Sequence, residues 1–102
     1  MPANLNMNDS RAVRTVLITN PQGLHARPAD MFVKTAGRFQ AKIEVVKDSE
    51  RVDGKSILAI LTLAAGEGTM LQIEAIGSDA EAALAALADL VERNFPENGC
   101  VQ

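Results

Sequence analysis

The chain has 102 residues, 47% of them hydrophobic, which is enough apolar material for one domain with its own core. Its net charge of −3 and its 3% aromatic content argue against a nucleic-acid partner, because such partners are bound by basic faces and aromatic stacking platforms. Cys100 is the only cysteine, so an internal disulfide framework and a cysteine-based zinc site are both excluded. No apolar run approaches the roughly 20 residues that span a bilayer, and the polar N-terminus is not typical of a secretory signal. We expect a cytoplasmic protein without membrane insertion.

Three regions are expected along the chain. Residues 1–11 are polar and lack periodicity, which predicts a disordered N-terminal extension. Residues 12–95 contain all the patterned segments and are predicted to form the single domain. Residues 96–102 follow the last periodic segment and are predicted to be a tail.

The first half of the domain predicts a strand, a turn and a helix. Residues 14–19 alternate, with Val16 and Ile18 on one face, which predicts a strand. Residues 20–23 predict a turn, because a proline fixes one φ angle and a glycine permits an unusual one. Residues 26–36 carry apolar side chains at helical spacing, and Gly37 supplies a stop.

The second half predicts two hairpin strands, a short helix, a further strand and a long helix. The strands are expected at 42–47 and 50–53, joined by a turn, and at 70–76. The short helix is expected from 57 to about 63, with Ser56 as its N-cap. Residues 78–81 have the spacing of a capping box, which predicts the start of the last helix. The apolar stripe of that helix is expected to consist of Ala80, Ala83, Leu84, Leu87 and Val91.

The predicted order is therefore β-α-β-β-α-β-α. So few strands can bury only one face of a sheet, so all three helices should lie together on one side of it. We predict the α+β class, as an open-faced sandwich of three helices on a four-stranded antiparallel sheet.

His25, the only histidine, is expected where the first strand and turn give way to a helix. Backbone N–H groups of a first helical turn, the positive end of the helix dipole and the Arg27 guanidinium would converge there. This combination is suited to holding a phosphate-sized anion beside an imidazole, and it makes His25 a candidate nucleophile with Arg27 as its anion-binding neighbour. A histidine at a helix start can equally be an ordinary surface residue.

The short helix after Ser56 is apolar nearly all round. If Ile60 and Leu63 point into the core, then Ile57, Leu58 and Leu61 remain exposed. An exposed apolar patch on a small soluble protein is typical of a surface that binds a partner. The alternative is that the loop around residues 65–66 covers this helix.

Two segments resemble the signatures of one known family. The run Gly-Leu-His-Ala-Arg-Pro at 23–28 resembles the active-site signature of HPr, the histidine-containing phosphocarrier of the bacterial phosphoenolpyruvate-dependent phosphotransferase system. The run Gly-Lys-Ser-Ile at 54–57 resembles the family's second signature, around its regulatory serine. The resemblance covers roughly residues 13–95, with both signatures in the family's register and on its element order.

The resemblance implies a carrier rather than an enzyme. His25 would accept a phosphoryl group on Nδ1 from enzyme I and pass it to a sugar-specific IIA component, with Arg27 stabilising the phosphate. Ser56 would be a regulatory site for HPr kinase/phosphorylase, although the serine also occurs in members that lack this kinase and its N-cap role needs nothing further. The implied protein is a monomer without cofactor or metal. The residues expected to contact partners are Leu24, Ile57, Leu58 and Leu61.

Two alternatives remain open besides the sugar carrier. A nitrogen-related or purely regulatory paralogue would have the same chemistry at His25 with other partners. A binding module that only presents the apolar patch would be expected to have lost the histidine, which this chain retains. Asp30 departs from the family pattern, because it places a carboxylate about one turn after His25, where it would oppose an incoming phosphoryl group.

Overall fold

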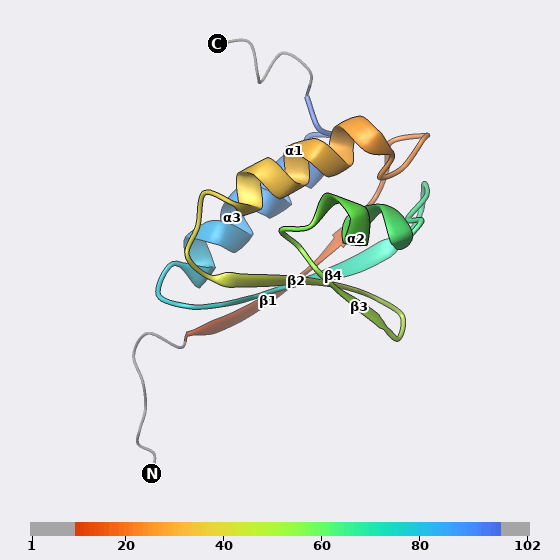
Figure 1. The fold of residues 1–102 in the computed structure, drawn as a ribbon. Helices are drawn as coiled ribbons and strands as arrows, with labels where there is room; N and C mark the ends of the chain where they lie inside the picture. Colours follow the sequence, from red (N-terminus) through yellow and green to blue (C-terminus); the bar gives the residue numbers. More distant parts are fainter. Residues whose placement is uncertain (1–9, 97–102) are drawn as a thin grey trace.

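The computed structural model describes residues 10–96, which form seven elements in the predicted order (Figure 1). The sheet and the three helices confirm the predicted α+β open-faced sandwich. The elements are β1 (Arg11–Leu17), α1 (Ala26–Ala36), β2 (Lys42–Lys47), β3 (Glu50–Asp53), α2 (Ile57–Thr62), β4 (Met70–Ile76) and α3 (Ala80–Glu92).

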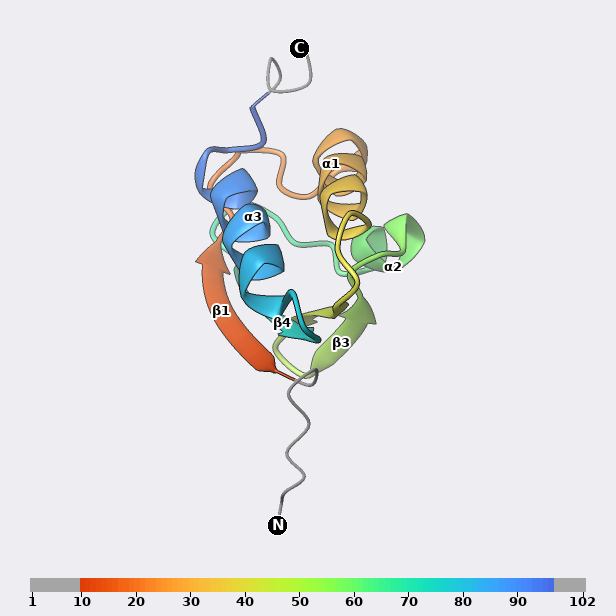
Figure 2. The ribbon, with the colours of Figure 1, turned by 90° about the vertical axis from the view of Figure 1, so that its left-hand side faces the viewer.

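The four strands form one antiparallel sheet in the order β1-β4-β2-β3. Figure 2 shows the three helices together on one side of this sheet. The inward face carries the apolar positions of each strand: Val16 of β1 lies opposite Leu71 of β4, and Ile43 of β2 lies opposite Ala75. The predicted stripe of α3 is buried against this face, together with Phe32 of α1 and Ile60 of α2. Among residues 10–96 no helix is long and apolar enough to cross a membrane.

Two local expectations were wrong. β1 begins at Arg11, earlier than the expected residue 14, so Arg11 belongs to the sheet and not to the polar extension. Ser78 does not form a capping box. The N-cap of α3 is Asp79, whose carboxylate makes no cap bond and instead accepts hydrogen bonds from the backbone N–H groups of Gln40 and Ala41, both at 2.8 Å. The bond from Gln40 holds the pKa of Asp79 below its ordinary value, and the pair ties the segment before β2 to the start of α3.

The outer face of the sheet carries an ion-pair network centred on Glu74 of β4. Glu74 lies directly opposite Glu44 of β2, an arrangement of like charges that is unfavourable by itself. Arg51 of β3 resolves it, because its Nη1 is 2.7 Å from Glu74 Oε1 and 2.8 Å from Glu44 Oε1. Arg11 Nη2 of β1 makes a second contact with Glu74 Oε1, at 3.1 Å. With its side chain only 8% exposed, Glu74 links three strands, and the hydrogen bond from Arg51 holds its pKa below the ordinary value of 4.5.

Glu74→Gln is expected to lower the free energy of unfolding at pH 7 by about 1 kcal/mol, because a charged acceptor of several hydrogen bonds becomes neutral. Since folding lowers the pKa of Glu74, its contribution is fully present above about pH 4.5 and is lost as the pH falls through the folded-state pKa. Urea unfolding from pH 7 to pH 3 should therefore show a shallower acid decline for the variant than for the wild type. Glu50→Gln, at an exposed position of β3, is the matched control. Equal acid declines for all three proteins would contradict the structural role of Glu74.

Candidate functional site

The turn that leads into α1 is closed by hydrogen bonds around Gly23. The Gly23 N–H donates to the Asn20 carbonyl at 2.9 Å, and the Gly23 carbonyl accepts from the Asn20 side-chain Nδ2 at 2.6 Å and from the His25 N–H at 2.9 Å. Gly23 has a φ of +67°, a conformation that side chains disfavour, so the predicted role of this glycine is confirmed. The backbone of His25 is thus held by its own turn.

A second segment clamps the same turn. The Leu24 N–H donates to the Ala65 carbonyl at 2.9 Å, and Gly23 packs so closely that a Cβ there would lie 2.3 Å from the Ala65 oxygen and 2.6 Å from Gly66 Cα. Leu24 is only 5% exposed and belongs to the core, and its contact with a partner stays a prediction. Its burial anchors the residue directly before His25.

His25 is the N-cap of α1, and only its backbone makes a hydrogen bond with the helix. Its φ and ψ are −80° and −166°, its carbonyl accepts from the Ala29 N–H at 3.0 Å, and its side chain makes no cap hydrogen bond. Pro28 has no N–H to satisfy, and Ala26 occupies a position whose N–H has no acceptor within a helix. The imidazole therefore lies beside the donor-rich, positive end of α1.

Two surface hollows meet at His25. One, of about 290 Å³, includes the polar residues Asn20, Arg27 and Asn94, and we refer to it as the polar hollow for these residues. The other, of about 300 Å³, is bordered by Leu24, Leu61 and the segment 64–66. His25 thus stands between a recess that includes Arg27 and Asn94 and a second recess bordered by Leu61 of α2 and the segment 64–66.

Arg27 and Asp30 differ in how they relate to His25. Arg27 shares the polar hollow with His25, and its Nη1 contacts Met31 Sδ at 3.4 Å, one turn further along α1. Asp30 Oδ2 pairs with Lys34 Nζ at 3.1 Å, so Lys34 offsets the carboxylate that the sequence placed against the phosphate. His25 and Arg27 thus line one hollow, and their joint role in binding a phosphoryl group stays a prediction.

Ser56 caps α2 as predicted, and its Oγ accepts from the Ala59 N–H at 3.2 Å. Leu58 is 73% exposed and Leu61 36% exposed, whereas Ile57 is partly buried and packs on the core. The expectation of an exposed Ile57 was therefore wrong, because the start of α2 leans on the sheet more than helical spacing alone suggests. Leu61 also borders the apolar hollow at His25, so α2 and the histidine share one face.

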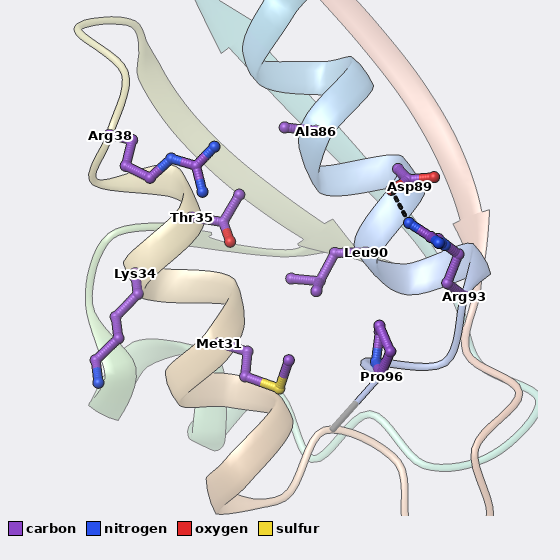
Figure 3. Close-up of a pocket in the computed structure, with 9 residues that line it drawn as sticks. All are labelled: Met31, Lys34, Thr35, Arg38, Ala86, Asp89, Leu90, Arg93 and Pro96. Atoms are coloured by element: carbon purple, nitrogen blue, oxygen red, sulfur yellow. Dashed lines mark hydrogen bonds and ion pairs between the residues drawn. The ribbon is translucent and has the colours of Figure 1, made fainter. Parts of the chain in front are cut away.

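A larger hollow of about 410 Å³ lies between α1 and α3 and does not include His25 (Figure 3). Each cation along it has a partner: Lys34 pairs with Asp30, Arg93 with Asp89 at 3.3 Å, and Arg38 lies over the Phe39 ring at 5.9 Å. The groove does not include His25, and the cations along it are engaged by the contacts just given, so we do not assign the site to it. Within residues 10–96 there is also no cluster of three or more histidine, cysteine or acidic side chains that could hold a metal.

Sequence reasoning missed three residues that complete the site, two of them from segments distant in sequence. Asn20 and Ala65 fix the turn, and Asn94 reaches the polar hollow from the end of α3. The only available signal for Asn94 was that asparagine favours the residue after a helix, which says nothing of its neighbours in space.

A family model described as the PTS HPr component phosphorylation site matches residues 12–93. The fold and this match define a phosphocarrier of the phosphotransferase system rather than an enzyme. The chain belongs to the HPr family.

Relatives agree with this membership. The phosphocarrier protein HPr of Treponema pallidum is 44% identical over 85 residues, covering 83% of this chain and 97% of that protein. The crystal structure of HPr from Bacillus anthracis is 46% identical with a TM-score of 0.77, covering 81% of this chain and 99% of that one. The Bacillus subtilis catabolite repression protein Crh is 38% identical with a TM-score of 0.66, covering 76% of this chain and 90% of that one, and its structure is a dimer with a swapped domain.

Proposed function

We propose that His25 is the residue that carries the phosphoryl group, received from phospho-enzyme I and passed to IIA components of the sugar phosphotransferase system. The supporting observation is an imidazole that makes no cap bond, stands at the positive end of α1 and shares a hollow with the Arg27 guanidinium. Family membership supports this class of reaction, and the geometry at the start of α1 supports His25 as the residue.

The transfer needs positioning more than acid–base chemistry. The lone pair of the unprotonated Nδ1 attacks phosphorus, the phosphorus–nitrogen bond to the donor histidine breaks, and the donor ring takes the electron pair. The other nitrogen of His25 keeps its proton throughout, so no general base is required. Arg27 and the N–H groups at the start of α1 neutralise the phosphoryl oxygens, which is the electrostatic help that phosphoryl transfer chiefly uses.

The direct test is incubation of the purified protein with enzyme I and labelled phosphoenolpyruvate. One phosphoryl group per chain, labile to acid and stable to base, is the expected product. Absence of label, or label that resists acid, would overturn the proposal.

We further propose that the exposed face of α2, consisting of Leu58 and Leu61 beside Ser56, is the docking surface for these partners and that phosphorylation of Ser56 by HPr kinase/phosphorylase regulates it. The side-chain cap of Ser56 places its oxygen at the start of α2, where the helix dipole tolerates a phosphate, so the fold would survive modification. A partner that buries Leu58 would have to desolvate that phosphate as well, at a cost of several kcal/mol.

Ser56→Asp and Leu58→Glu are each expected to lower kcat/KM for phosphorylation by enzyme I about tenfold, mainly by raising KM, because about 1.4 kcal/mol of binding free energy is lost. Ser56→Asn is the matched control, since asparagine caps a helix as well as aspartate but adds no charge. Leu58→Gln removes the apolar contact without adding a charge, so its comparison with Leu58→Glu separates the two effects. Wild-type kinetics for both acidic variants would contradict the docking surface and, with it, the regulatory role of Ser56.

A regulatory or nitrogen-related paralogue is the second candidate function, and the similarity to Crh favours keeping it. Both candidates use His25 in the same way and differ only in the acceptor. Competition among purified IIA components of the sugar and nitrogen branches for the phosphorylated protein decides between them. The monomeric state stays a prediction, to be measured by sedimentation because Crh forms a dimer.

A further inference from the structure

The end of α3 has a defined geometry that brings Asn94 to the polar hollow at His25. The Asn94 N–H donates to the Val91 carbonyl at 3.0 Å, and the Phe95 N–H donates to the Leu90 carbonyl at 2.9 Å. These two bonds, with a φ of +59° at Asn94, form the Schellman arrangement that terminates helices. Because both carbonyls are used internally, they do not direct their negative ends at the hollow.

Phe95 holds this chain reversal in place. Its φ of +51° is unfavourable for a bulky residue, and it is compensated by the burial of the ring in the core. The burial of Phe95 therefore fixes where the backbone of Asn94 lies, although the side chain of Asn94 is on the surface.

The carboxamide of Asn94 is oriented by Thr19. The Thr19 hydroxyl donates a hydrogen bond to Asn94 Oδ1, the acceptor atom of the carboxamide. The opposite end, Nδ2, carries two N–H donors. Asn94 lines the same hollow of about 290 Å³ as His25 and Arg27.

We propose that Asn94 Nδ2 donates a hydrogen bond to an oxygen of the phosphoryl group on His25, so that Asn94 is a phosphate-binding residue contributed by the end of α3. This inference rests on the proposed function of His25. A phosphoryl group on the ring has three acceptor oxygens. Arg27 and the N–H groups at the start of α1 belong to one helix, whereas Asn94 follows α3 and lines the same hollow. Asn94 would therefore add a neutral donor from a second element, without a further charge.

The competing explanation is that Asn94 only ends α3, since asparagine tolerates a positive φ better than most residues. Three substitutions separate the two roles. Asn94→Gly keeps the favoured backbone geometry and removes the carboxamide. Asn94→Asp keeps the acceptor for Thr19 and replaces the N–H donors with a negative oxygen. Thr19→Val leaves the carboxamide in place but releases its orientation.

The measurement is the equilibrium constant for phosphoryl exchange between phospho-enzyme I and each variant, with thermal unfolding in parallel. We expect about a fivefold shift toward phospho-enzyme I for Asn94→Gly, at least tenfold for Asn94→Asp and a smaller shift for Thr19→Val. The melting temperature of Asn94→Gly should be unchanged or raised. Gln72→Glu adds the same charge as Asn94→Asp on the exposed outer face of the sheet and should leave the equilibrium unchanged.

A direct signature comes from the side-chain amide of Asn94 in ¹⁵N-labelled protein. Its resonance should shift on phosphorylation, and its assignment is checked by its loss in Asn94→Gly. Wild-type protein phosphorylated on His25, with all three variants at the wild-type equilibrium and no amide shift, would overturn the role of Asn94 alone. Wild-type protein that is not phosphorylated on His25 would overturn both this role and the proposed function.

Discussion

His25→Ala is expected to accept no phosphoryl group from enzyme I, while folding as the wild type does. The loss should be complete rather than partial, because His25 is the only histidine in the sequence and no other side chain in the polar hollow is a comparable nucleophile. Labelling with phosphoenolpyruvate, followed by mass measurement of the intact chain, gives the result directly.

The fold should survive this change because the local structure depends on the backbone of residue 25. Its N–H bonds to the Gly23 carbonyl and its carbonyl accepts from Ala29, while the ring caps nothing. Thermal unfolding of His25→Ala should therefore match the wild type within about 1 kcal/mol, since surface substitutions away from special contacts cost little. Residual acid-labile phosphate on the variant would show that another group carries the phosphoryl.

Gly23→Ala is expected to be the most damaging small substitution near the site, costing about 2–5 kcal/mol of folding free energy. A positive φ costs about 1–2 kcal/mol for a residue with a Cβ, and the clash with the Ala65 carbonyl adds a packing cost of about 1–3 kcal/mol. The strain falls on the contact between Gly23 and Ala65, which holds the turn before His25. We therefore expect kcat/KM for phosphorylation to fall at least tenfold as well, because a small displacement of a reacting group lowers the rate steeply.

Two other glycines separate these causes. Gly68 also has a positive φ, of +87°, but a Cβ there would meet nothing within 4 Å, so Gly68→Ala should show the conformational cost alone. Gly66 has open space and no positive φ, so Gly66→Ala should be nearly neutral. If urea unfolding places Gly23→Ala level with Gly68→Ala, the clamp between residues 23 and 65 does not contribute to stability.

Local patterns predicted the elements well because each depends on residues close in sequence. The bounds of α1, the cap by Ser56 and the strand faces all follow from spacing, cap chemistry and alternation. That His25 and Arg27 line one hollow was predictable for the same reason, since both lie at the start of one helix. Asp79 was misjudged because its carboxylate binds the backbone of a segment that the sequence places far away.

The site residues that were misjudged or missed also depend on contacts between segments that are far apart in the sequence. Helical spacing shows which side chains of α2 lie together but not how far the sheet covers them, so the burial of Ile57 could not be foreseen. The likeness of 23–28 to an active-site signature suggested partner contact for Leu24, whereas the position of residue 65 makes it an anchor. Asn94 reaches His25 only because Phe95 is drawn into the core.

The placement of Asn94 has a practical consequence for handling this protein. Pro96, which borders the groove between α1 and α3, is two residues after Asn94, so a sequence attached directly after Pro96 begins close to the hollow that includes His25. Residue 10 directly precedes β1, and the other end of this strand leads to the turn before His25. β1 has 7 residues and is therefore roughly 20 Å long. Affinity tags, fluorophores and surface attachments for transfer assays are therefore best placed before β1, where they do not compete with enzyme I for access to His25.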